Sequence, residues 1–541
     1  MVTNREIDVK ILTINAKNDH EDGTANIERA ISATGYGTFN VLLLLAALPV
    51  AWTGIFDTTT TAFILASAEC DLQLTFFRKG VLVAFPFLGM VLTSFIWDYL
   101  TPYVGTRNLF IFALFADSIL NVLSSAVDNY YLFLAMKFLS GVLTGGPFSM
   151  VIAYLSEFHS AKYKESFARW AGLAVNAAII VPAAIGFVIL PWSLNVDVFY
   201  RRYTSWRIYL LICSTVPVLG LVTASALPQT PKYLMDIGKP EEAMKLLRRM
   251  YCINKRKPAN TFPIKTLLVW ENSQISRQSI FQETTEKIRL SCYNTKLLFS
   301  SPYVRTVAFL NFLQFGSMLG FNTMRLWVPH LFIILNNFDD EKWNKDRAPT
   351  MREMLDRRNA LPARDYLDCP EFQDICITWK INAAIYQNST LIAFTAVFFS
   401  FLAGLITTCK LRKKLILACC VTVAAFLISV VSSFGMNWAQ LPPYMLTLAA
   451  AIIVTTRITG NIVTAVNVDV IPIPLRSTSL AMLTTVGNVA AILGNFLFSA
   501  LLDVECLVAF MGMGCLLLAC FCLSFFQPKP VRETSTQVLQ A

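Results

Sequence analysis

The sequence predicts an all-α membrane protein with twelve transmembrane helices, arranged as two pseudo-symmetric bundles of six. Residues of the hydrophobic set make up 55% of the 541 positions, only 15% are charged, and the mean hydropathy is +0.54. This composition leaves too little polar surface to cover the core of a water-soluble protein. The apolar residues also gather in runs of membrane-spanning length. Together these observations exclude a cytosolic globular protein and a disordered chain.

Each expected span is an apolar run, because a hydrocarbon core of about 30 Å requires roughly 20 helical residues. The twelve runs are 41–66, 80–97, 108–126, 131–155, 170–191, 207–227, 303–335, 383–408, 415–434, 443–466, 478–502 and 506–526. A polar, net acidic segment precedes the first run. We therefore expect that run to be a spanning helix and not part of a cleaved signal peptide.

The connectors between the runs predict the orientation of the chain. An even number of spans places both termini on one side of the membrane, and basic residues in short loops mark the cytoplasmic side. The connectors on the side of the termini are basic, as at Arg107, Arg476 and the turn 410–414, whereas connector 503–505 on the other side has no Lys or Arg. Both termini are therefore predicted to be cytoplasmic.

Five parts follow from this division. They are a cytoplasmic tail (1–35), a six-helix bundle (36–227), a cytoplasmic central loop (228–302), a second six-helix bundle (303–526) that includes a non-cytoplasmic loop (336–382), and a cytoplasmic tail (527–541). Pro240 and the two glutamates after it predict a short surface helix within the central loop. Six spans on each side of a central loop are typical of transporters built from two like halves around a cavity.

The net charge of +10 does not indicate a nucleic-acid partner, because most basic residues lie in connectors beside the bilayer. Three histidines are scattered over a tail, a loop and a helix end, so no metal site or catalytic triad is expected. There is also no phosphate-binding glycine-lysine loop and no dinucleotide fingerprint. The sequence thus predicts neither an enzyme nor a cofactor, and any energy for transport must come from a gradient.

Most of the thirteen cysteines fall in apolar runs, where a cysteine acts as a small hydrophobic residue. Cys369 and Cys376 lie together in the loop 336–382, where an oxidising compartment would allow a disulfide. Cys70 lies on the same side without an evident mate.

Ionisable residues within spans are candidates for function, because each costs at least about 2.5–3.5 kcal/mol to insert. Asp57 and Lys137 lie roughly 13 Å and 9 Å below the outer ends of the first and fourth spans, counted at 1.5 Å per residue. A lysine side chain bridges that difference, so we expect the two to form an ion pair. Two interpretations remain open: a pair that a proton or a charged substrate breaks during transport, and a static pair that fixes helix packing.

In the second half, Arg457 lies near the middle of its span with Asn461 one turn later on the same face. Arg457 is a candidate to contact an anionic or polar group of a substrate; the alternative is that it binds carbonyls of neighbouring helices. Asn176 and Asn488 are candidates for a polar cavity lining, although hydrogen bonds between helices would explain them equally well. Trp327 is either a stacking face at the outer mouth or an anchor at the membrane interface.

Several motifs carry a resemblance to a known family. They are Leu65-Ala66-Ser67-Ala68-Glu69-Cys70-Asp71, Lys137-Phe138-Leu139-Ser140-Gly141, Ser205-Trp206-Arg207, Pro228-Gln229-Thr230-Pro231-Lys232-Tyr233 and Trp327-Val328-Pro329. In these motifs the chain resembles the major facilitator superfamily, in the branch of sugar porters, organic ion transporters and the synaptic vesicle glycoprotein 2 family. The resemblance implies the major facilitator fold. It also implies that Phe56-Asp57-Thr58 corresponds to the Tyr-Asp-Thr of sugar porters, and Lys137 to their basic residue on the fourth helix.

The resemblance also implies a set of gating residues. They are Gly89, Asp98, Gly105, Arg107, Glu157, Arg207 and Arg476. The helix 2–3 signature is eroded, because its acid is displaced to Asp98 and one arginine before Arg107 is missing. The family's Pro-Glu-Ser-Pro-Arg has likewise become Pro228-Gln229-Thr230-Pro231-Lys232, without the carboxylate.

The function implied is secondary transport, by alternating access, of a small polar organic solute that is sugar-like or an organic ion, with or without a co-transported proton. The transporter is expected to be a monomer in the lipid bilayer of the plasma membrane or of an intracellular vesicle. The eroded helix 2–3 signature leaves an alternative open: a transport-incompetent membrane receptor or trafficking partner that acts through the loop 228–302. A membrane-embedded enzyme is disfavoured, because no acid-base or nucleophile set converges.

Overall fold

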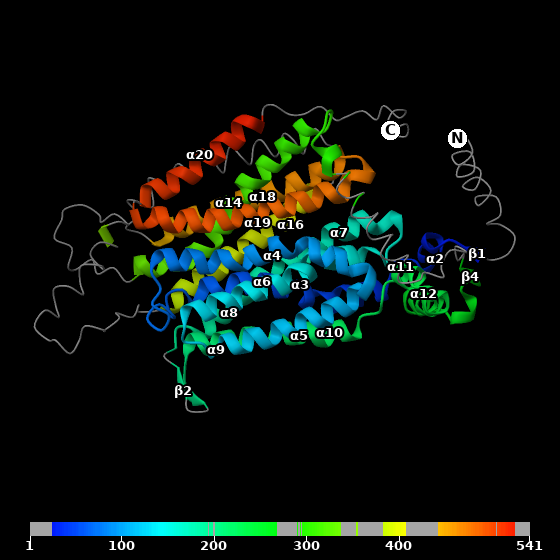
Figure 1. Cartoon of the computed structure of the whole chain (residues 1–541), viewed down its shortest axis with the longest axis horizontal. Helices are drawn as coiled ribbons and strands as arrows, with labels where there is room; N and C mark the ends of the chain where they lie inside the picture. The colour runs from blue at the N-terminus through cyan, green and yellow to red at the C-terminus, as the bar shows by residue number, and fades with distance from the viewer. Residues whose placement is uncertain are drawn as a thin grey trace, which may run out of the picture.

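The computed structural model is mainly helical, and most of its long helices run alongside one another (Figure 1). It describes residues 24–192, 194–198, 201–267, 289, 293, 295–336, 353–354, 382–406, 442–504 and 506–524. The predicted span 415–434, Cys369, Cys376 and the tail 527–541 lie outside the described residues. Helices before residue 227 belong to the N-terminal half of the protein, and helices after residue 303 belong to the C-terminal half.

The N-terminal half contains four long helices and two broken ones. The long helices are α3 (Thr38–Ile64), α4 (Phe76–Val104), α5 (Thr106–Ser124) and α6 (Tyr130–Ser156). The fifth span is α7 (Ala161–Asn176), the 3-10 turn η1 (Ala177–Ile179) and α8 (Ile180–Ile189), and the sixth is α9 (Ser205–Cys213) with α10 (Thr215–Ala226). Pro182 and Pro217 have no amide hydrogen to donate to the carbonyls four residues earlier, which explains both breaks.

The C-terminal half contains α14 (Val304–Asn336), α16 (Ala383–Ile406), α18 (Pro442–Val470), α19 (Ile473–Val504) and α20 (Cys506–Ser524). Within the described residues, ten helical segments are long and apolar enough to cross a membrane. The apolar helix α20 occupies the last of the predicted runs.

Close helix crossings set the position of α4. Gly141 of α6 lies against the backbone of Pro86, and Gly89 of α4 lies against the carbonyl of Phe138, so a Cβ at either glycine would overlap the neighbouring backbone. Gly80, near the start of α4, lies against the side chain of Ser499 of α19, which a Cβ at that glycine would overlap. Helix α4 therefore packs tightly on α6 within its own half and on α19 across the two halves.

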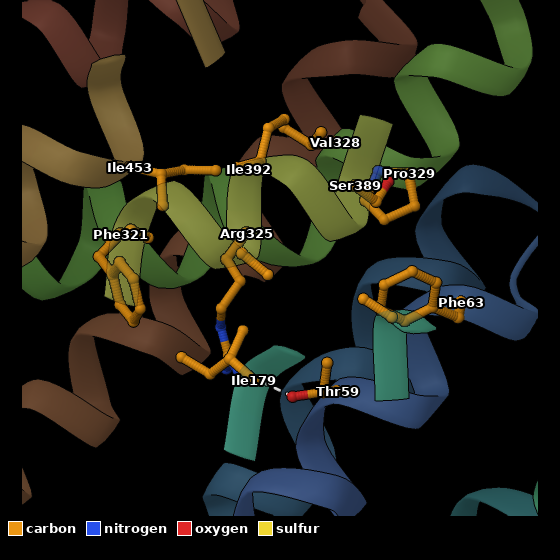
Figure 2. A pocket seen from close by; sticks show the side chains of 13 residues that line it. Thr59, Phe63, Ile179, Phe321, Arg325, Val328, Pro329, Ser389, Ile392 and Ile453 are labelled. Carbon is orange, nitrogen blue, oxygen red and sulfur yellow. Dashed lines mark hydrogen bonds between the residues drawn. The ribbon is translucent and has the colours of Figure 1, made fainter. Parts of the chain in front are cut away.

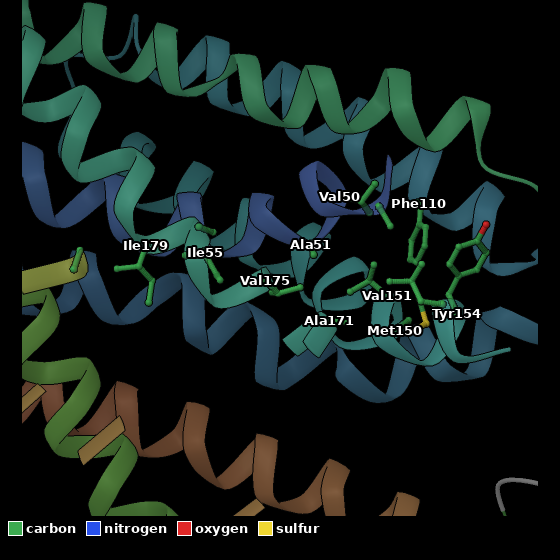
Figure 3. Close-up of a cluster of buried hydrophobic side chains, with 14 of the residues drawn as sticks. Val50, Ala51, Ile55, Phe110, Met150, Val151, Tyr154, Ala171, Val175 and Ile179 are labelled. Atoms are coloured by element: carbon green, nitrogen blue, oxygen red, sulfur yellow. The ribbon is translucent and has the colours of Figure 1, made fainter. Parts of the chain in front are cut away.

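The apolar core of the N-terminal half fills the space between these helices. Figure 3 shows part of it, where Val50 and Ala51 of α3 lie near Phe110 of α5 and Met150 and Tyr154 of α6. These side chains are almost completely buried. Apolar packing of this kind fixes the rotation of each helix and thereby the direction in which its few polar residues point.

A small layer covers one end of the bundle, which we call the α12 end (Figure 1). It contains α2 (Ile27–Thr34), α11 (Pro231–Asp236), α12 (Pro240–Lys255), the turn η2 (Ala259–Thr261), and the parallel pair of β1 (Thr24–Ala25) with β4 (Thr266–Leu267). Helix α12 begins at the predicted Pro240. Helix α2 lies within the segment 1–35 that we expected to be a tail, and it buries Ala30 and Ile31 in the same apolar cluster as Leu247.

The opposite end carries the hairpin of β2 (Asn195–Val198) and β3 (Arg201–Thr204), paired in antiparallel register from Asn195 and Thr204 to Val198 and Arg201. We call it the β2 end (Figure 1).

Candidate functional site

A buried polar cluster joins three helices of the N-terminal half. Asn121 of α5 donates from Nδ2 to Asp57 Oδ1 of α3 at 2.9 Å and to Asp117 Oδ2 at 3.0 Å. Lys137 of α6 donates from Nζ to Asn121 Oδ1 at 3.1 Å. Ser140, one turn later on α6, donates to Asp117 Oδ1 at 2.6 Å. Asn121 is therefore the centre of the cluster.

The sequence predicted a direct ion pair between Asp57 and Lys137, and the structure brings the two residues into one cluster with Asn121 between them. The sequence also places Asp117 and Asn121 one turn apart in the third span, where a polar cavity lining and a hydrogen bond between helices would explain them equally well. The structure brings both into the cluster.

The charges in this cluster do not balance when every group is ionised. Asp57 and Asp117 are two carboxyl groups and Lys137 is one ammonium, and all three are at most 3% exposed. An uncompensated charge is costly in a buried site. Asp57 Oδ2 is buried and makes no hydrogen bond, so it offers a place for one proton. The arrangement can therefore bind and release a proton.

A second polar group lies where the two halves meet. Arg325 of α14 donates from Nη1 to Thr59 Oγ1 of α3 at 2.8 Å (Figure 2). It also donates from Nη2 to Asn322 Oδ1 at 3.2 Å. Arg457 of α18 donates to Oδ1 of Asn176, which is the last residue of α7. The hydrogen bonds Arg325–Thr59 and Arg457–Asn176 therefore both join the C-terminal half to the N-terminal half.

The two arginines share an aromatic neighbour. The guanidinium carbon of Arg325 lies 5.5 Å from the ring centroid of Phe321, and that of Arg457 lies 4.8 Å from it. Both arginine side chains are half-buried. Within the described residues, neither forms an ion pair with a carboxylate.

A small cavity of about 30 Å³ adjoins this site. Its lining comes from both halves and includes Thr59, Phe63, Phe321, Arg325 and Ile392 (Figure 2). A volume of this size has room for about two water molecules, and too little for a sugar or an organic acid. The space beside Arg325, as the described residues form it, is therefore too small to hold such a solute.

Sequence analysis missed Arg325, because it lies in the run 303–335, whose other residues are almost all uncharged. A single arginine twenty or so residues into that run is the signal that could have found it. Asn461 and Asn488 are half-buried on α18 and α19. Trp327 is completely buried, packs on His330 and Phe498, and is not among the residues that line the cavity.

The candidate gating residues near the helix 2–3 turn contact α6, α10 and α11. Gly105 has φ +82°, which favours glycine, and the ring of Tyr233 covers it. Arg107 donates from Nη2 to the carbonyl of Ser225 at the end of α10. Gly89 lies at the middle of α4, in the crossing with α6.

The other gating candidates lie apart from one another. Arg207 is at the β2 end, where it forms an ion pair with Asp128 at 2.5 Å and donates to the carbonyl of Ser125 at 3.1 Å. Glu157 ends α6 and Arg476 lies in the first turn of α19. Asp98 lies on α4.

At the β2 end, a hydrogen-bonded group connects the two halves. Lys79 of α4 donates from Nζ to Glu69 Oε2 at 2.8 Å, and the same atom lies 3.2 Å from His330 Nε2 of α14. Tyr386 of α16 donates to the carbonyl of Phe63 of α3 at 3.3 Å. These contacts close the β2 end between the halves.

Cys70 is disulfide-bonded. The cysteines Cys213, Cys252, Cys515, Cys520 and Cys522 are free thiols. Among the described residues, no group of three histidine, cysteine, aspartate or glutamate side chains is placed to hold a metal ion.

Two helical halves that meet at a polar site in the middle of the bundle define a protein of the major facilitator class. The model of the sugar (and other) transporter family matches residues 33–322, and the chain belongs to that family, which is one of transporters and not of enzymes. The resemblance to sugar porters and vesicle glycoproteins inferred from the motifs is thereby confirmed.

Related proteins include synaptic vesicle glycoprotein 2A of Rattus norvegicus, which is 28% identical over 244 residues, covering 44% of this chain and 33% of that protein. Synaptic vesicle glycoprotein 2B of Mus musculus is 25% identical over 349 residues, covering 60% of this chain and 49% of that protein. The chain thus spans between a third and a half of the length of these relatives.

Solved structures with the same fold include the partially occluded inward-open conformation of the xylose transporter XylE from E. coli, with a TM-score of 0.61 and 14% identity. That match covers 91% of this chain and 100% of the other. A crystal structure of a D-xylose-proton symporter gives a TM-score of 0.60 at 14% identity, covering 91% and 98%. The twelve-helix architecture predicted from the sequence is therefore confirmed as that of the major facilitator superfamily.

Proposed function

We propose that the chain is a secondary transporter that moves a small polar organic solute across a membrane by alternating access. The observation that carries the proposal is the pair of hydrogen bonds from Arg325 to Thr59 and from Arg457 to Asn176. Each bond joins one half to the other at the middle of the bundle. A rocking motion of the halves would break and remake both bonds, so a solute that competes for the arginines is coupled to the motion.

The buried cluster around Asn121 is the proposed coupling site. Asp57 and Thr59 are two residues apart on α3, which turns the helix by about 200° and places them on opposite faces. Asp57 faces Asn121 of α5, and Thr59 faces Arg325 of α14. A change in the tilt or rotation of α3 therefore acts on both sites at once. Binding of a proton at Asp57 Oδ2 would neutralise the excess negative charge and change the interactions that hold α3 in place.

The contacts at the β2 end support a closed state of the transport cycle. Opening towards that end requires Lys79 to separate from His330 and Tyr386 to separate from the carbonyl of Phe63. The small cavity beside Arg325 would then widen and admit a solute.

The proposed orientation places the α12 end in the cytoplasm. The exposed face of α12 carries Lys245, Arg248 and Arg249, and basic residues close to a membrane favour the cytoplasmic side. The proposal includes a monomer, in the plasma membrane or in the membrane of an intracellular vesicle.

Counterflow into liposomes tests the proposal. The purified full-length chain is reconstituted, the liposomes are loaded with one solute of a panel of sugars, organic anions and organic cations, and uptake of the labelled solute is measured. Uptake that depends on the protein and on loading supports a carrier. A folded, reconstituted protein that exchanges no solute of any class would contradict transport and favour the alternative of a receptor that acts through the segment 228–302.

A further inference from the structure

We propose that the solute is an organic anion whose acidic group binds between Arg325 and Arg457 while its apolar body packs on Phe321 and the neighbouring cavity wall. This inference rests on the proposed transport function and narrows its solute to one chemical class.

The first observation is an unbalanced positive charge in the middle of the bundle. The hydrogen bonds of Arg325 go to a hydroxyl of Thr59 and an amide oxygen of Asn322, and that of Arg457 goes to an amide oxygen of Asn176. All three acceptors are neutral. In the part of the chain that the structure describes, neither arginine forms an ion pair.

The two acids on the other face of α3 do not supply the missing charge. Asp57 and Asp117 make their hydrogen bonds with Asn121 and Ser140. Lys137 already offsets one of the two carboxylates within that cluster. Charged groups inside a membrane are normally paired or face a water-filled cavity that serves the transported ligand. The two arginines are therefore expected to receive their counter-charge from a ligand.

The second observation is the shape of the arginine site. Both guanidinium groups lie against the ring of Phe321, at 5.5 Å and 4.8 Å from its centroid, so the two cations are neighbours of one aromatic ring. Arg325 Nε is buried and makes no hydrogen bond, which leaves a donor on the edge of the guanidinium group. Guanidinium groups bind carboxylates and phosphates through two parallel hydrogen bonds.

The third observation is the apolar wall of the adjoining cavity. Phe63, Ile179, Ile392 and Ile453 line it together with Arg325. Such a surface packs well against an aromatic or aliphatic body and offers little to the many hydroxyl groups of a sugar. The site thus combines cationic donors with an apolar wall, which matches an organic anion.

An anion at this site would also act on the interface between the halves. It would replace Thr59 and Asn176 as the acceptor for the two arginines. Both hydrogen bonds across the halves would then be released by binding, whereas a neutral solute competes only weakly for a guanidinium group. Binding energy would thereby be used to open the closed conformation.

Binding to the purified full-length protein in detergent tests the inference without any transport step. The probes are benzoate, its neutral isostere benzamide, succinate and glucose, at matched ionic strength, and the measurement is the shift of the unfolding temperature with probe concentration. We expect benzoate or succinate to stabilise the protein with a saturable dose response. Benzamide and glucose are expected to give no shift over the same range.

Variants of the two arginines identify the site. Arg325→Gln and Arg457→Gln are each expected to weaken carboxylate binding roughly 10- to 100-fold. Arg325→Lys keeps the positive charge but loses the pair of parallel donors of the guanidinium group. It is therefore expected to prefer benzoate over benzamide still, with weaker affinity. Arg248→Gln, on the exposed face of α12, is the matched control and is expected to bind as the natural protein does. The unfolding temperature without probe shows whether each variant is folded.

The outcomes separate this inference from transport itself. Stabilisation by none of the carboxylates, or equal carboxylate affinity in the glutamine variants and the control, would overturn the anion site. Counterflow of glucose without counterflow of benzoate or succinate would overturn the anion site as well and would leave transport standing. Saturable binding of a carboxylate through Arg325 and Arg457, with no counterflow of any solute, would support the anion site and contradict transport.

Discussion

Arg325 Nη1 and Thr59 Oγ1 form a 2.8 Å hydrogen bond that joins α14 to α3 across the two halves of the protein. Thr59 lies two residues after Asp57, which faces the opposite side of α3 and accepts a hydrogen bond from Asn121. A single turn of one helix therefore carries the acceptor for a cation of the other half and a carboxyl group that can take up a proton. This relationship is the physical basis on which the proposed solute site and the proposed proton site would act on each other without contact.

Replacement of Thr59 by valine tests the contribution of this bond to the closed conformation. Valine has nearly the shape of threonine but leaves Arg325 without its acceptor on α3. We expect a loss of about 1–3 kcal/mol in the closed state, seen as a lower unfolding temperature of the purified protein.

The matched control for that change is Thr60→Val. Thr60 donates to the carbonyl of Phe56 within α3, so among the described residues the control removes no hydrogen bond between the halves. An equal fall in unfolding temperature for Thr59→Val and Thr60→Val would show that the bond to Arg325 does not stabilise the closed conformation.

Replacement of Asp57 by asparagine tests the proposed proton coupling. Asparagine can still interact with Asn121 but can no longer gain or lose a proton. We expect Asp57→Asn to keep solute counterflow, which needs no net proton movement, and to lose accumulation driven by a pH gradient. Both are measured in the same proteoliposomes.

Glu242→Gln serves as the control, because Glu242 is exposed and pairs with Lys239 on the surface of α12. Its uptake is expected to follow the pH gradient as in the natural protein. If uptake by Asp57→Asn were as fast and as dependent on pH as uptake by the natural protein, the cluster around Asn121 would only fix helix packing and would not couple a proton to transport.

The positions of the described helices could be predicted from the sequence for a physical reason. A chain in lipid must satisfy its backbone hydrogen bonds within each segment, so an apolar run of sufficient length has almost no alternative to a helix. Depth along a span is then a matter of counting residues. That count placed Asp57 and Lys137 at similar depth, and both belong to the cluster around Asn121.

The direction in which each residue points could not be predicted in the same way. Asn121 lies between Asp57 and Lys137 because of the rotation of α5 about its axis, and that rotation depends on packing with α3 and α6. Counting along one helix contains no information on it. For the same reason, the sequence did not show that Arg457 would meet Asn176 of the other half.

Two further features, Arg325 and helix α2, were missed because hydropathy is averaged over a run and because a short helix has little periodicity. Arg325 is a single charge in a long apolar run, so the mean hydropathy of the run hides it. Helix α2 has only eight residues and is stabilised by burial of Ala30 and Ile31 against α12, which is more than two hundred residues away in the chain. Local periodicity in a polar segment does not reveal a contact of that kind.

The glycine crossings between α4 and α6 give a prediction about stability. Gly141→Ala would place a Cβ against the backbone of Pro86, and backbone cannot move aside as a flexible side chain can. We expect a loss of about 1–3 kcal/mol from overpacking. Gly172→Ala is the control, since a Cβ there meets nothing within 4 Å, and alanine in a helix is favoured over glycine by up to about 1 kcal/mol.

The unfolding temperatures of Gly141→Ala, Gly172→Ala and the natural protein are measured and compared. Gly141→Ala is expected to fall below the natural protein, and Gly172→Ala to equal or exceed it. A Gly141→Ala variant as stable as Gly172→Ala would contradict the tight crossing of α4 and α6.

A histidine at the α12 end predicts a dependence of stability on pH. His159 follows α6 and lies outside the spanning segments, where its Nδ1 is 2.8 Å from the carbonyl of Leu155 and its Nε2 is 3.0 Å from Asn40 Nδ2. A carbonyl can only accept, so we assign the proton to Nδ1 and expect Nε2 to accept from Asn40. Burial lowers the pKa of His159 below 6.5, and its hydrogen bond to Leu155 offsets part of that effect.

Because the pKa of His159 is lower in the folded protein than in the unfolded chain, the unfolded chain binds the additional proton first as the pH falls. The stability that neutral His159 contributes is therefore fully present above about pH 6.5. It is lost towards the lower pKa of the folded state, at up to about 1.4 kcal/mol per pH unit. Glutamine cannot titrate in this range, so the advantage of the natural protein over His159→Gln should shrink between pH 7.5 and pH 5. We would measure both unfolding temperatures across this range, and an advantage that stays constant or grows towards pH 5 would show that His159 is not held neutral by the fold.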